Sequence, residues 1–414
     1  MMTRLEEMGA AAKQAARILA VAGNQKDIAL EAIAAALEEH TGEILAANRE
    51  DLAAAEENGM SRSLMDRLAL NEKRIAGMAD GVRQVKAQPD PIGQVLEGGV
   101  RPNGLRIEKV AVPLGVIGII YEARPNVTAD AAALCLKAGN AVILRGGKEA
   151  FRSNQAIAEV MRDAVESAGL PRDSIQLVQD TTRASSIEMM GLTGYLDVLI
   201  PRGGAGLIRA VVENSHVPVI ETGVGNCHVY VDDAADTQMA VDIIYNAKTS
   251  RPSVCNAIET VLVHKDAAQR VLPAMKAKLD EKQVEIRGCE KTQEILPGCV
   301  PACEEDWGTE FLDYILAVKV VDSLEDAMAH IARYSSGHSE CIVTENYRNA
   351  ERFLSEVDAA AVYVNASTRF TDGGEFGLGA EIGISTQKLH ARGPMGIRQL
   401  TSQKFVIRGS GQIR

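Results

Sequence analysis

The stretch from Pro113 to Asn126 reads PLGVIGIIYEARPN. Its centre, Val116 to Tyr121, is a short continuous apolar run, which is typical of a strand buried on both faces. The polar, proline-containing segment after Tyr121 predicts a turn. Strands buried on both faces belong to parallel sheets covered by helices, so this stretch favours an α/β fold.

Similar apolar runs recur towards the C-terminus. They are Ala141 to Arg145, Ile175 to Val178, Val198 to Pro201 and Val217 to Ile220. Helical patterns separate them, for example Asn154 to Ala168, in which apolar residues repeat on one face. Strands that alternate with helices in this way predict a doubly wound parallel sheet.

A second alternating series follows and predicts a second α/β domain. Its strands are expected at Ile258 to His264, Ile315 to Val321, Cys341 to Thr344 and Ala361 to Asn365, and its helices at Ala267 to Leu279, Leu324 to Tyr334 and Arg348 to Val357. The first hundred residues are instead helical, because apolar residues from Leu30 to Leu37 repeat at helical spacing. The irregular segment from Ser367 to Gly396 is expected to form functional loops.

Composition excludes several classes of protein. The 414 residues carry a formal net charge of −12 and no dense cluster of Lys and Arg, which argues against a nucleic-acid partner. No apolar stretch approaches the length that spans a bilayer, and the charged N-terminus does not resemble a signal peptide. Seven scattered cysteines favour reduced thiols in the cytoplasm. Cys289, Cys299 and Cys303 lack zinc-site spacing, so no metal is expected.

Cys255 is the candidate nucleophile. It lies in the segment Ser250 to Ala257, where Pro252 suits a helix end or a turn. Arg251 places a cation close by in sequence, and a nearby cation lowers the pKa of a thiol and so favours the nucleophilic thiolate. The alternative is a buried structural cysteine, because cysteine is often fully buried. The local sequence does not decide between these two interpretations.

Asn126, Glu221 and Glu310 are candidates of a second kind. Asn126 follows the strand ending at Tyr121, and ligands of open α/β sheets bind at the carboxyl ends of strands. Its amide can donate to a developing oxyanion. Glu221 is a candidate general base or substrate contact, and Glu310 a candidate ligand of ribose hydroxyls. The alternatives are an ordinary turn for Asn126 and ordinary surface acids for the two glutamates.

Basic and glycine-rich turns follow two further strands. Arg145 ends one strand and Lys148 comes three residues later; basic residues at this point accommodate the 2′-phosphate of NADP(H). Two solvated charges beside a turn are the alternative. Gly203, Gly204 and Gly206 precede an apolar helix, where bare backbone N–H groups can bind phosphate. A tight strand-to-helix connection is the plain alternative there.

These stretches, in this order, resemble the aldehyde dehydrogenase superfamily, and within it the acyl-phosphate reductases that act on γ-glutamyl phosphate. The resemblance covers Ala10 to Ile413. Its most specific stretches are Pro113 to Asn126, Leu144 to Glu149, Ser250 to Cys255, Asp306 to Glu310 and His390 to Pro394.

The resemblance implies a role for each candidate. Cys255 falls at the nucleophile position of the superfamily, and Glu221 at the general-base position of its hydrolytic members. Arg145 matches the basic residue that contacts the adenosine ribose, and Glu310 the acid that binds the nicotinamide ribose. The glycines from 203 to 206 match the loop near the pyrophosphate.

The oxyanion donor is the one role that the resemblance leaves open. The Asn of the hydrolytic members aligns without gaps with Arg124, two residues before Asn126, and Asn126 is favoured on donor type. The implied activity is NADPH-dependent reduction of L-glutamyl 5-phosphate to L-glutamate 5-semialdehyde through a Cys255 thioester, in proline biosynthesis. Because that substrate carries a carboxylate and a phosphate, Arg124, Arg251 and Arg369 are the candidates to bind it.

Two other functions remain open at this point. A hydrolytic aldehyde dehydrogenase would use water where the reductase uses phosphate. The other alternative is a protein on the same scaffold that binds a nucleotide without catalysing a reaction. Such a protein would keep its function if Cys255 were replaced.

The superfamily also implies an architecture. Residues 1–230 would form a cofactor-binding domain with a helical N-terminus and an arm strand near 104–112. Residues 231–366 would form the catalytic domain, and 367–414 would return to the first domain and end in a second arm strand. A two-stranded ribbon is marginal alone, so the arm is expected to reach a neighbouring subunit of a homo-oligomer. A glutamate kinase that supplies the acyl phosphate is the further partner implied.

Overall fold

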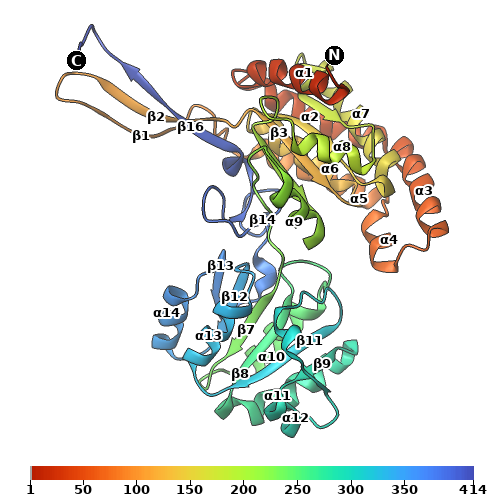
Figure 1. The fold of residues 1–414 in the computed structure, drawn as a ribbon, viewed down its shortest axis with the longest axis vertical. Coiled ribbons are helices and arrows are strands. Elements are labelled where there is room, and N and C mark those ends of the chain that lie inside the picture. Colours follow the sequence, from red (N-terminus) through yellow and green to blue (C-terminus); the bar gives the residue numbers. More distant parts are fainter. Residues whose placement is uncertain (1) are drawn as a thin grey trace. The chain divides into compact units, whose positions relative to one another are not determined.

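The computed structural model describes residues 2–414, apart from the side chains of residues 62 and 63 (Figure 1). The chain forms two compact units. The first comprises the chain up to Thr222 together with Gly377–Gly383 and Met395–Arg414, and the second comprises Gly223–Phe376 and Ile384–Pro394. The expected boundary at residue 230 therefore moves to Thr222, because β7 (Cys227–Val231) pairs within the second unit.

The first unit contains a four-stranded parallel sheet in the order β5-β4-β3-β6. Its strands are β3 (Val116–Tyr121), β4 (Ala141–Arg145), β5 (Ile175–Leu177) and β6 (Val198–Arg202). Its helices are α1 (Arg4–Leu19), α2 (Gln25–Glu39), α3 (Thr41–Glu57), α4 (Arg62–Leu68), α5 (Glu72–Ala87), α6 (Asn126–Lys137), α7 (Phe151–Ser167), α8 (Arg183–Met190) and α9 (Ala205–Asn214). Every residue of β3 is buried, which confirms the two-sided burial expected from its apolar run.

The strand predicted at Val217 to Ile220 is wrong. This segment runs beside β6 but forms only an isolated bridge between Val219 and Leu199. Pro218 has no backbone N–H to donate, so a regular ladder cannot continue through it. Its carbonyl still accepts a hydrogen bond from the Leu199 N–H over 2.8 Å.

Three antiparallel strands form an arm that extends from the first unit (Figure 1). They are β1 (Val95–Val100), β2 (Arg106–Pro113) and β16 (Thr401–Arg408), in the order β1-β2-β16. The expected pairing of the two arm strands is confirmed, because β16 pairs with β2 over its full length. The carboxylate of Glu108 accepts hydrogen bonds from Arg106 of the same strand and from Arg408 of β16, and the second of these joins β2 to β16 through their side chains.

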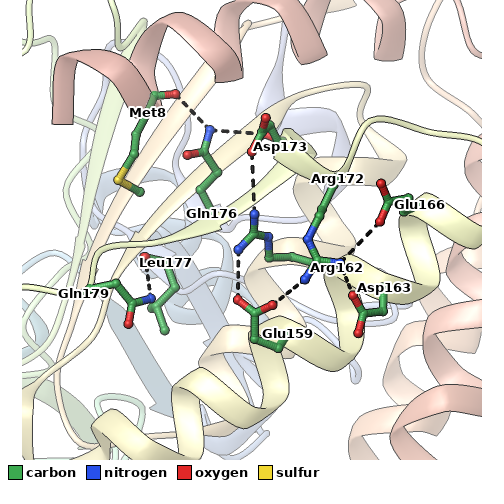
Figure 2. A network of polar contacts seen from close by, with 10 residues as sticks. All are labelled: Met8, Glu159, Arg162, Asp163, Glu166, Arg172, Asp173, Gln176, Leu177 and Gln179. Carbon is green, nitrogen blue, oxygen red and sulfur yellow. Dashed lines mark hydrogen bonds and ion pairs between the residues drawn. The ribbon is translucent and has the colours of Figure 1, made fainter. Parts of the chain in front are cut away.

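A polar network joins the helices of the first unit to its edge strand β5 (Figure 2). Gln176 of β5 donates to the Met8 carbonyl of α1 over 2.8 Å. Arg172, just before β5, forms ion pairs with three acids of α7, which are Glu159, Asp163 and Glu166. Because Arg172 bridges acids one turn apart, it fixes the loop before β5 against the exposed face of α7.

The second unit contains a seven-stranded, fully parallel sheet in the order β10-β9-β11-β8-β7-β12-β13. Its strands are β7 (Cys227–Val231), β8 (Ile258–His264), β9 (Glu285–Gly288), β10 (Val300–Pro301), β11 (Ile315–Val321), β12 (Ser339–Val343) and β13 (Ala361–Val364), and a separate pair joins β14 (Ile384–Ser385) to β15 (Gly393–Pro394). Its helices are α10 (Thr237–Thr249), α11 (Lys265–Leu279), α12 (Glu290–Ile295), α13 (Leu324–Tyr334) and α14 (Tyr347–Glu356).

Helices cover both faces of this sheet. Ile244 of α10 and Leu272 of α11 belong to the buried cluster on one face. Ile331 of α13 and Phe353 of α14 pack with Tyr230 on the other. Among the helices that the structure describes, none is long and apolar enough to cross a membrane.

Candidate active site

Cys255 lies on the turn between α10 and β8 in the second unit. Pro252 cannot donate the backbone hydrogen bond that a further helical turn would need, so the chain leaves the helix before it. Cys255 is half-buried, whereas Cys227 and Cys341 are fully buried. Partial exposure is a condition under which a thiol can react, but Cys289 and Cys299 share it, so the role of Cys255 as the nucleophile stays a prediction.

The loops around Cys255 gather at the amino-terminal edge of the seven-stranded sheet. Gly225 precedes β7, Cys255 precedes β8, and Glu310 precedes β11. Because β7, β8 and β11 are parallel and adjacent, the amino ends of these strands lie side by side.

Gly225 packs directly against the backbone of Cys255. A Cβ atom at residue 225 would lie 1.7 Å from the Cys255 carbonyl oxygen, so only glycine fits there. The Gly225 N–H donates to Glu310 Oε1 over 2.8 Å, and the Cys227 thiol donates to the Cys255 carbonyl over 3.2 Å. Burial raises the pKa of the Cys227 thiol well above its ordinary value, so it remains a protonated donor. These contacts fix the main chain that carries the nucleophile.

Arg369 is held beside Cys255 by two polar side chains. It donates through Nε to Ser250 Oγ over 3.0 Å and through Nη1 to the side-chain oxygen of Asn256. Asn256 in turn donates to the carbonyls of Arg369 and Thr371, and its own carbonyl accepts from the Thr368 hydroxyl. The turn carrying Arg369 is therefore tied to the residue that follows the nucleophile.

The charges around Cys255 are mutually dependent. Burial lowers the pKa of Arg369; Asp372 and Cys255 oppose this shift, and Arg251 adds to it. Arg369, Arg251 and Cys255 are therefore close enough to interact electrostatically, and the substrate-binding role of the two arginines stays a prediction. A guanidinium near a thiol favours the thiolate.

The candidates of the first unit lie at the carboxyl edge of its four-stranded sheet. Arg124 and Asn126 follow β3, Arg145 ends β4, and Gly203 follows β6. β3 and β6 are neighbours, whereas the chain passes from β3 to β4 and β5 on the other side. The strand order therefore reverses between β3 and β6, and ligands of such sheets bind at this reversal.

Arg145 is fixed by the loop after β5. Its Nη2 donates to the carbonyls of Thr181 and Thr182 over 2.7 and 2.8 Å, and its Nε donates to Ser185. Burial lowers the pKa of Arg145, while Asp180 and Glu149 oppose that shift. Lys148 lies exposed one turn further on. The role of Arg145 and Lys148 towards a nucleotide stays a prediction.

Glu122 is a residue of this edge that the sequence reasoning missed. Its carboxylate accepts the Gly204 N–H over 2.8 Å at the start of α9. A Cβ atom at Gly203 would lie 2.7 Å from the same carboxylate. The Gly204 N–H is therefore paired with a side-chain carboxylate, and the phosphate-binding role expected of Gly203, Gly204 and Gly206 stays a prediction.

Asn126 and Glu221 are less closely tied to Cys255. Asn126 is the first residue of α6 rather than part of a loop, and its amide donates to Asp130 over 3.0 Å. Burial raises the pKa of Asp130 to about 6. Glu221 is half-buried just before the end of the first unit at Thr222. Both residues belong to the first unit and Cys255 to the second, so their roles towards the thiol stay predictions.

Comparison with known proteins places the chain in a family. Residues 3–294 match the model of the aldehyde dehydrogenase family. This chain belongs to the aldehyde dehydrogenase family. The γ-glutamyl phosphate reductase of Moorella thermoacetica is 63% identical over 99% of this chain and 98% of that protein, and the one of Clostridium perfringens is 61% identical over 98% of each. The crystal structure of γ-glutamyl phosphate reductase from Thermotoga maritima covers 100% of both chains with a TM-score of 0.96 and 52% identity.

The expected resemblance is therefore confirmed, and the chain is an oxidoreductase with the aldehyde dehydrogenase fold. Within the part of the chain that the structure describes, no group of His, Cys, Asp and Glu side chains could hold a metal ion. Besides Glu122, the residues that sequence reasoning missed are Gly225, Asn256 and Ser250. Asn256 had one available signal, because it follows the candidate nucleophile directly.

Proposed function

We propose that this member of the aldehyde dehydrogenase family reduces L-glutamyl 5-phosphate to L-glutamate 5-semialdehyde and phosphate with NADPH, as a step of proline biosynthesis. Relatives named for this reductase match nearly the whole chain. The observation that carries the proposal is the placement of Cys255. It is a half-buried thiol on a fixed main chain, with Arg369 and Arg251 in its electrostatic surroundings.

The reaction begins at Cys255. Its thiolate attacks the acyl carbon, the carbon–oxygen bond to phosphate breaks, and a thioester remains. NADPH, when bound, supplies the hydride that reduces the thioester carbon. The resulting thiohemiacetal oxyanion, stabilised by Asn126 or Arg124, expels the Cys255 thiolate and leaves the semialdehyde. Water takes no part, so Glu221 has a supporting role rather than that of a deacylation base.

The arginines give the substrate its place. Arg369 and Arg251 are proposed to bind the anionic groups of the acyl phosphate, together with Arg124 from the first unit. Because Ser250 and Asn256 hold the guanidinium of Arg369, little side-chain entropy is lost when an anion binds there.

The cofactor residues favour NADP(H). Arg145 and Lys148 would pair with a 2′-phosphate, where an acid would repel it. Gly203, Gly204 and Gly206 would lie near the pyrophosphate. Glu310 uses one carboxylate oxygen for Gly225, and the other would accept a hydroxyl of the nicotinamide ribose.

The assembly and the cellular setting complete the proposal. Exposed apolar side chains on the arm, among them Val100, Phe405 and Ile407, support a homo-oligomer in which the arm packs on a second copy. All seven cysteines are free thiols, which supports the cytoplasm. A glutamate kinase is the proposed source of the acyl phosphate, because that anhydride is too reactive to store.

The test is a coupled assay with γ-glutamyl phosphate generated in situ, comparing NADPH with NADH in the wild type and in Cys255→Ser. Activity should depend on Cys255 and favour NADPH. In the reverse direction, oxidation of the semialdehyde should require phosphate. Full turnover without phosphate would establish a hydrolytic dehydrogenase instead, and undiminished physiological function of Cys255→Ser would establish a non-catalytic role.

A further inference from the structure

A buried ion pair spans the loop that carries Cys255. Lys248 lies in the last turn of α10 and Glu259 is the second residue of β8, so they stand at the two ends of that loop. Lys248 Nζ lies 2.5 Å from Glu259 Oε2, and neither side chain is exposed to solvent. Removing two charges from water is costly, and well-packed apolar residues can often replace such a pair without loss of stability. Stability alone therefore does not account for it.

The second oxygen of Glu259 makes a further contact. Glu259 Oε1 accepts the Leu312 N–H over 3.2 Å. Leu312 has a φ of 57°, a left-handed conformation that costs a non-glycine residue free energy and needs support from its surroundings. Leu312 is exposed enough that packing supplies little of that support. The hydrogen bond to the buried carboxylate is therefore a direct means of holding this turn.

The turn at Leu312 places Glu310. Glu310 lies two residues earlier, and its Oε1 accepts the Gly225 N–H over 2.8 Å. Gly225 in turn lies against the Cys255 carbonyl. The contacts thus form a closed path from the Cys255 loop through Lys248 and Glu259 to the turn of Leu312, on to Glu310, and back to the Cys255 backbone.

We propose that Lys248 and Glu259 are positioning residues, which set Glu310 and the Cys255 loop in register with each other. They touch neither substrate nor cofactor and act through Leu312 and Gly225. The inference rests on the proposed function only in treating Cys255 as the nucleophile and Glu310 as a cofactor contact. It explains why a carboxylate is retained in the core: Glu259 needs two acceptor oxygens, one for Lys248 and one for the Leu312 N–H.

Two matched double variants separate positioning from packing. Lys248→Met/Glu259→Gln and Lys248→Met/Glu259→Leu both remove the buried charges, but only the first keeps an acceptor for the Leu312 N–H. Melting temperature reports stability. The dissociation constant of NADPH reports Glu310, and the alkylation rate of Cys255 by iodoacetamide in the cofactor-free enzyme reports the loop.

The Leu variant should melt near the Gln variant yet bind NADPH about tenfold more weakly and show a changed alkylation rate. When Glu310→Gln is added to the Leu variant, it should weaken NADPH binding by less than it does in the wild type. The reason is that the Leu variant has already lost the contact between Glu310 and NADPH. Equal NADPH binding and alkylation in the two variants, or full additivity with Glu310→Gln, would overturn the proposal.

A third variant approaches the same hydrogen bond from the surface. Leu312→Val raises the cost of the left-handed conformation at residue 312, because a β-branched residue tolerates a φ of 57° poorly, and it leaves the buried pair intact. With Leu312→Gly as its matched control, Leu312→Val decides the question if the core variants fail to fold. It should weaken NADPH binding as Glu310→Gln does, and wild-type affinity would refute the positioning role. Undiminished turnover by Cys255→Ser would contradict the proposed function instead. The comparison of NADPH dissociation constants would still test the positioning role.

Discussion

The contact between Gly225 and Cys255 gives the sharpest prediction. In Gly225→Ala the new methyl would lie 1.7 Å from the Cys255 carbonyl oxygen and 2.3 Å from its Cα. Ordinary contact begins at 3.4 Å, so the two backbones must move apart by about 1.7 Å. A misplacement of about 1 Å at a reacting group costs about 10²-fold in rate. We therefore expect kcat to fall at least about 10²-fold, with the added strain destabilising the fold by about 1–3 kcal/mol.

The assay is phosphate-dependent oxidation of glutamate 5-semialdehyde at saturating NADP⁺ and phosphate, followed by NADPH absorbance, with circular dichroism to confirm folding. Gly308→Ala is the matched control, because a Cβ atom there meets nothing within 4 Å. It should retain wild-type kinetics. A folded Gly225→Ala variant with kcat within about threefold of the wild type would refute the reasoning from the clash.

Four further predictions follow from other parts of the structure. Arg369→Ala should raise KM for the semialdehyde or the acyl phosphate about 10- to 100-fold, through loss of a charged hydrogen bond; an unchanged KM would contradict its role. Lys148→Glu should lower kcat/KM for NADPH about tenfold and leave NADH unaffected, and equal losses with both cofactors would argue against a 2′-phosphate contact. Burial lowers the pKa of His330 to about 3, so below pH 6.5 the unfolded chain binds a proton that the folded chain does not. The free energy of unfolding should thus fall by up to about 1.4 kcal/mol per pH unit between pH 6.5 and 3. His330→Asn keeps an acceptor for Lys319 and should reduce the dependence of the melting temperature on pH over this range. An unchanged dependence would exclude His330 as the cause. A chain ending at Leu400 lacks β16 and should be monomeric by light scattering where the full chain is an oligomer, and a monomeric full chain would refute the role of the arm.

The strands that the sequence predicted best are buried on both faces. β3, β4, β8 and β11 begin and end at the residues expected from their apolar runs. Such runs, bounded by polar turns, leave few alternatives. β1 carries no such signal, because its six residues include Gly98 and Gly99 and all are exposed. It forms because β2 offers a partner, which the local sequence of β1 does not encode.

The residues of the candidate site also fall into two groups, those that the sequence can name as candidates and those that it cannot. Side chains with chemistry of their own, such as Cys255 and Arg369, can be named as candidates from the sequence, but the local sequence left Cys255 open and the family resemblance selected both. The residues that hold them cannot be named in this way, because their contacts join distant segments: Arg369 meets Asn256 across 113 positions, and Gly225 meets Glu310 across 85. A glycine or an asparagine in a loop has many ordinary explanations, and only the folded arrangement shows which one applies.

The pairing of β16 with β2 has a consequence for how the protein is made. Glu108 and Arg408, which meet across these strands, are 300 positions apart, so at about 5–20 residues per second a ribosome needs roughly 15–60 s to supply the second after the first. During that interval one edge of β2 has no partner and can recruit strands from other nascent chains. The second unit is almost complete in sequence by then and can fold on the ribosome. Arrest of translation before residue 401 would thus leave a folded second unit attached to β2 with one unpaired edge. Chaperones would be expected to bind such a product.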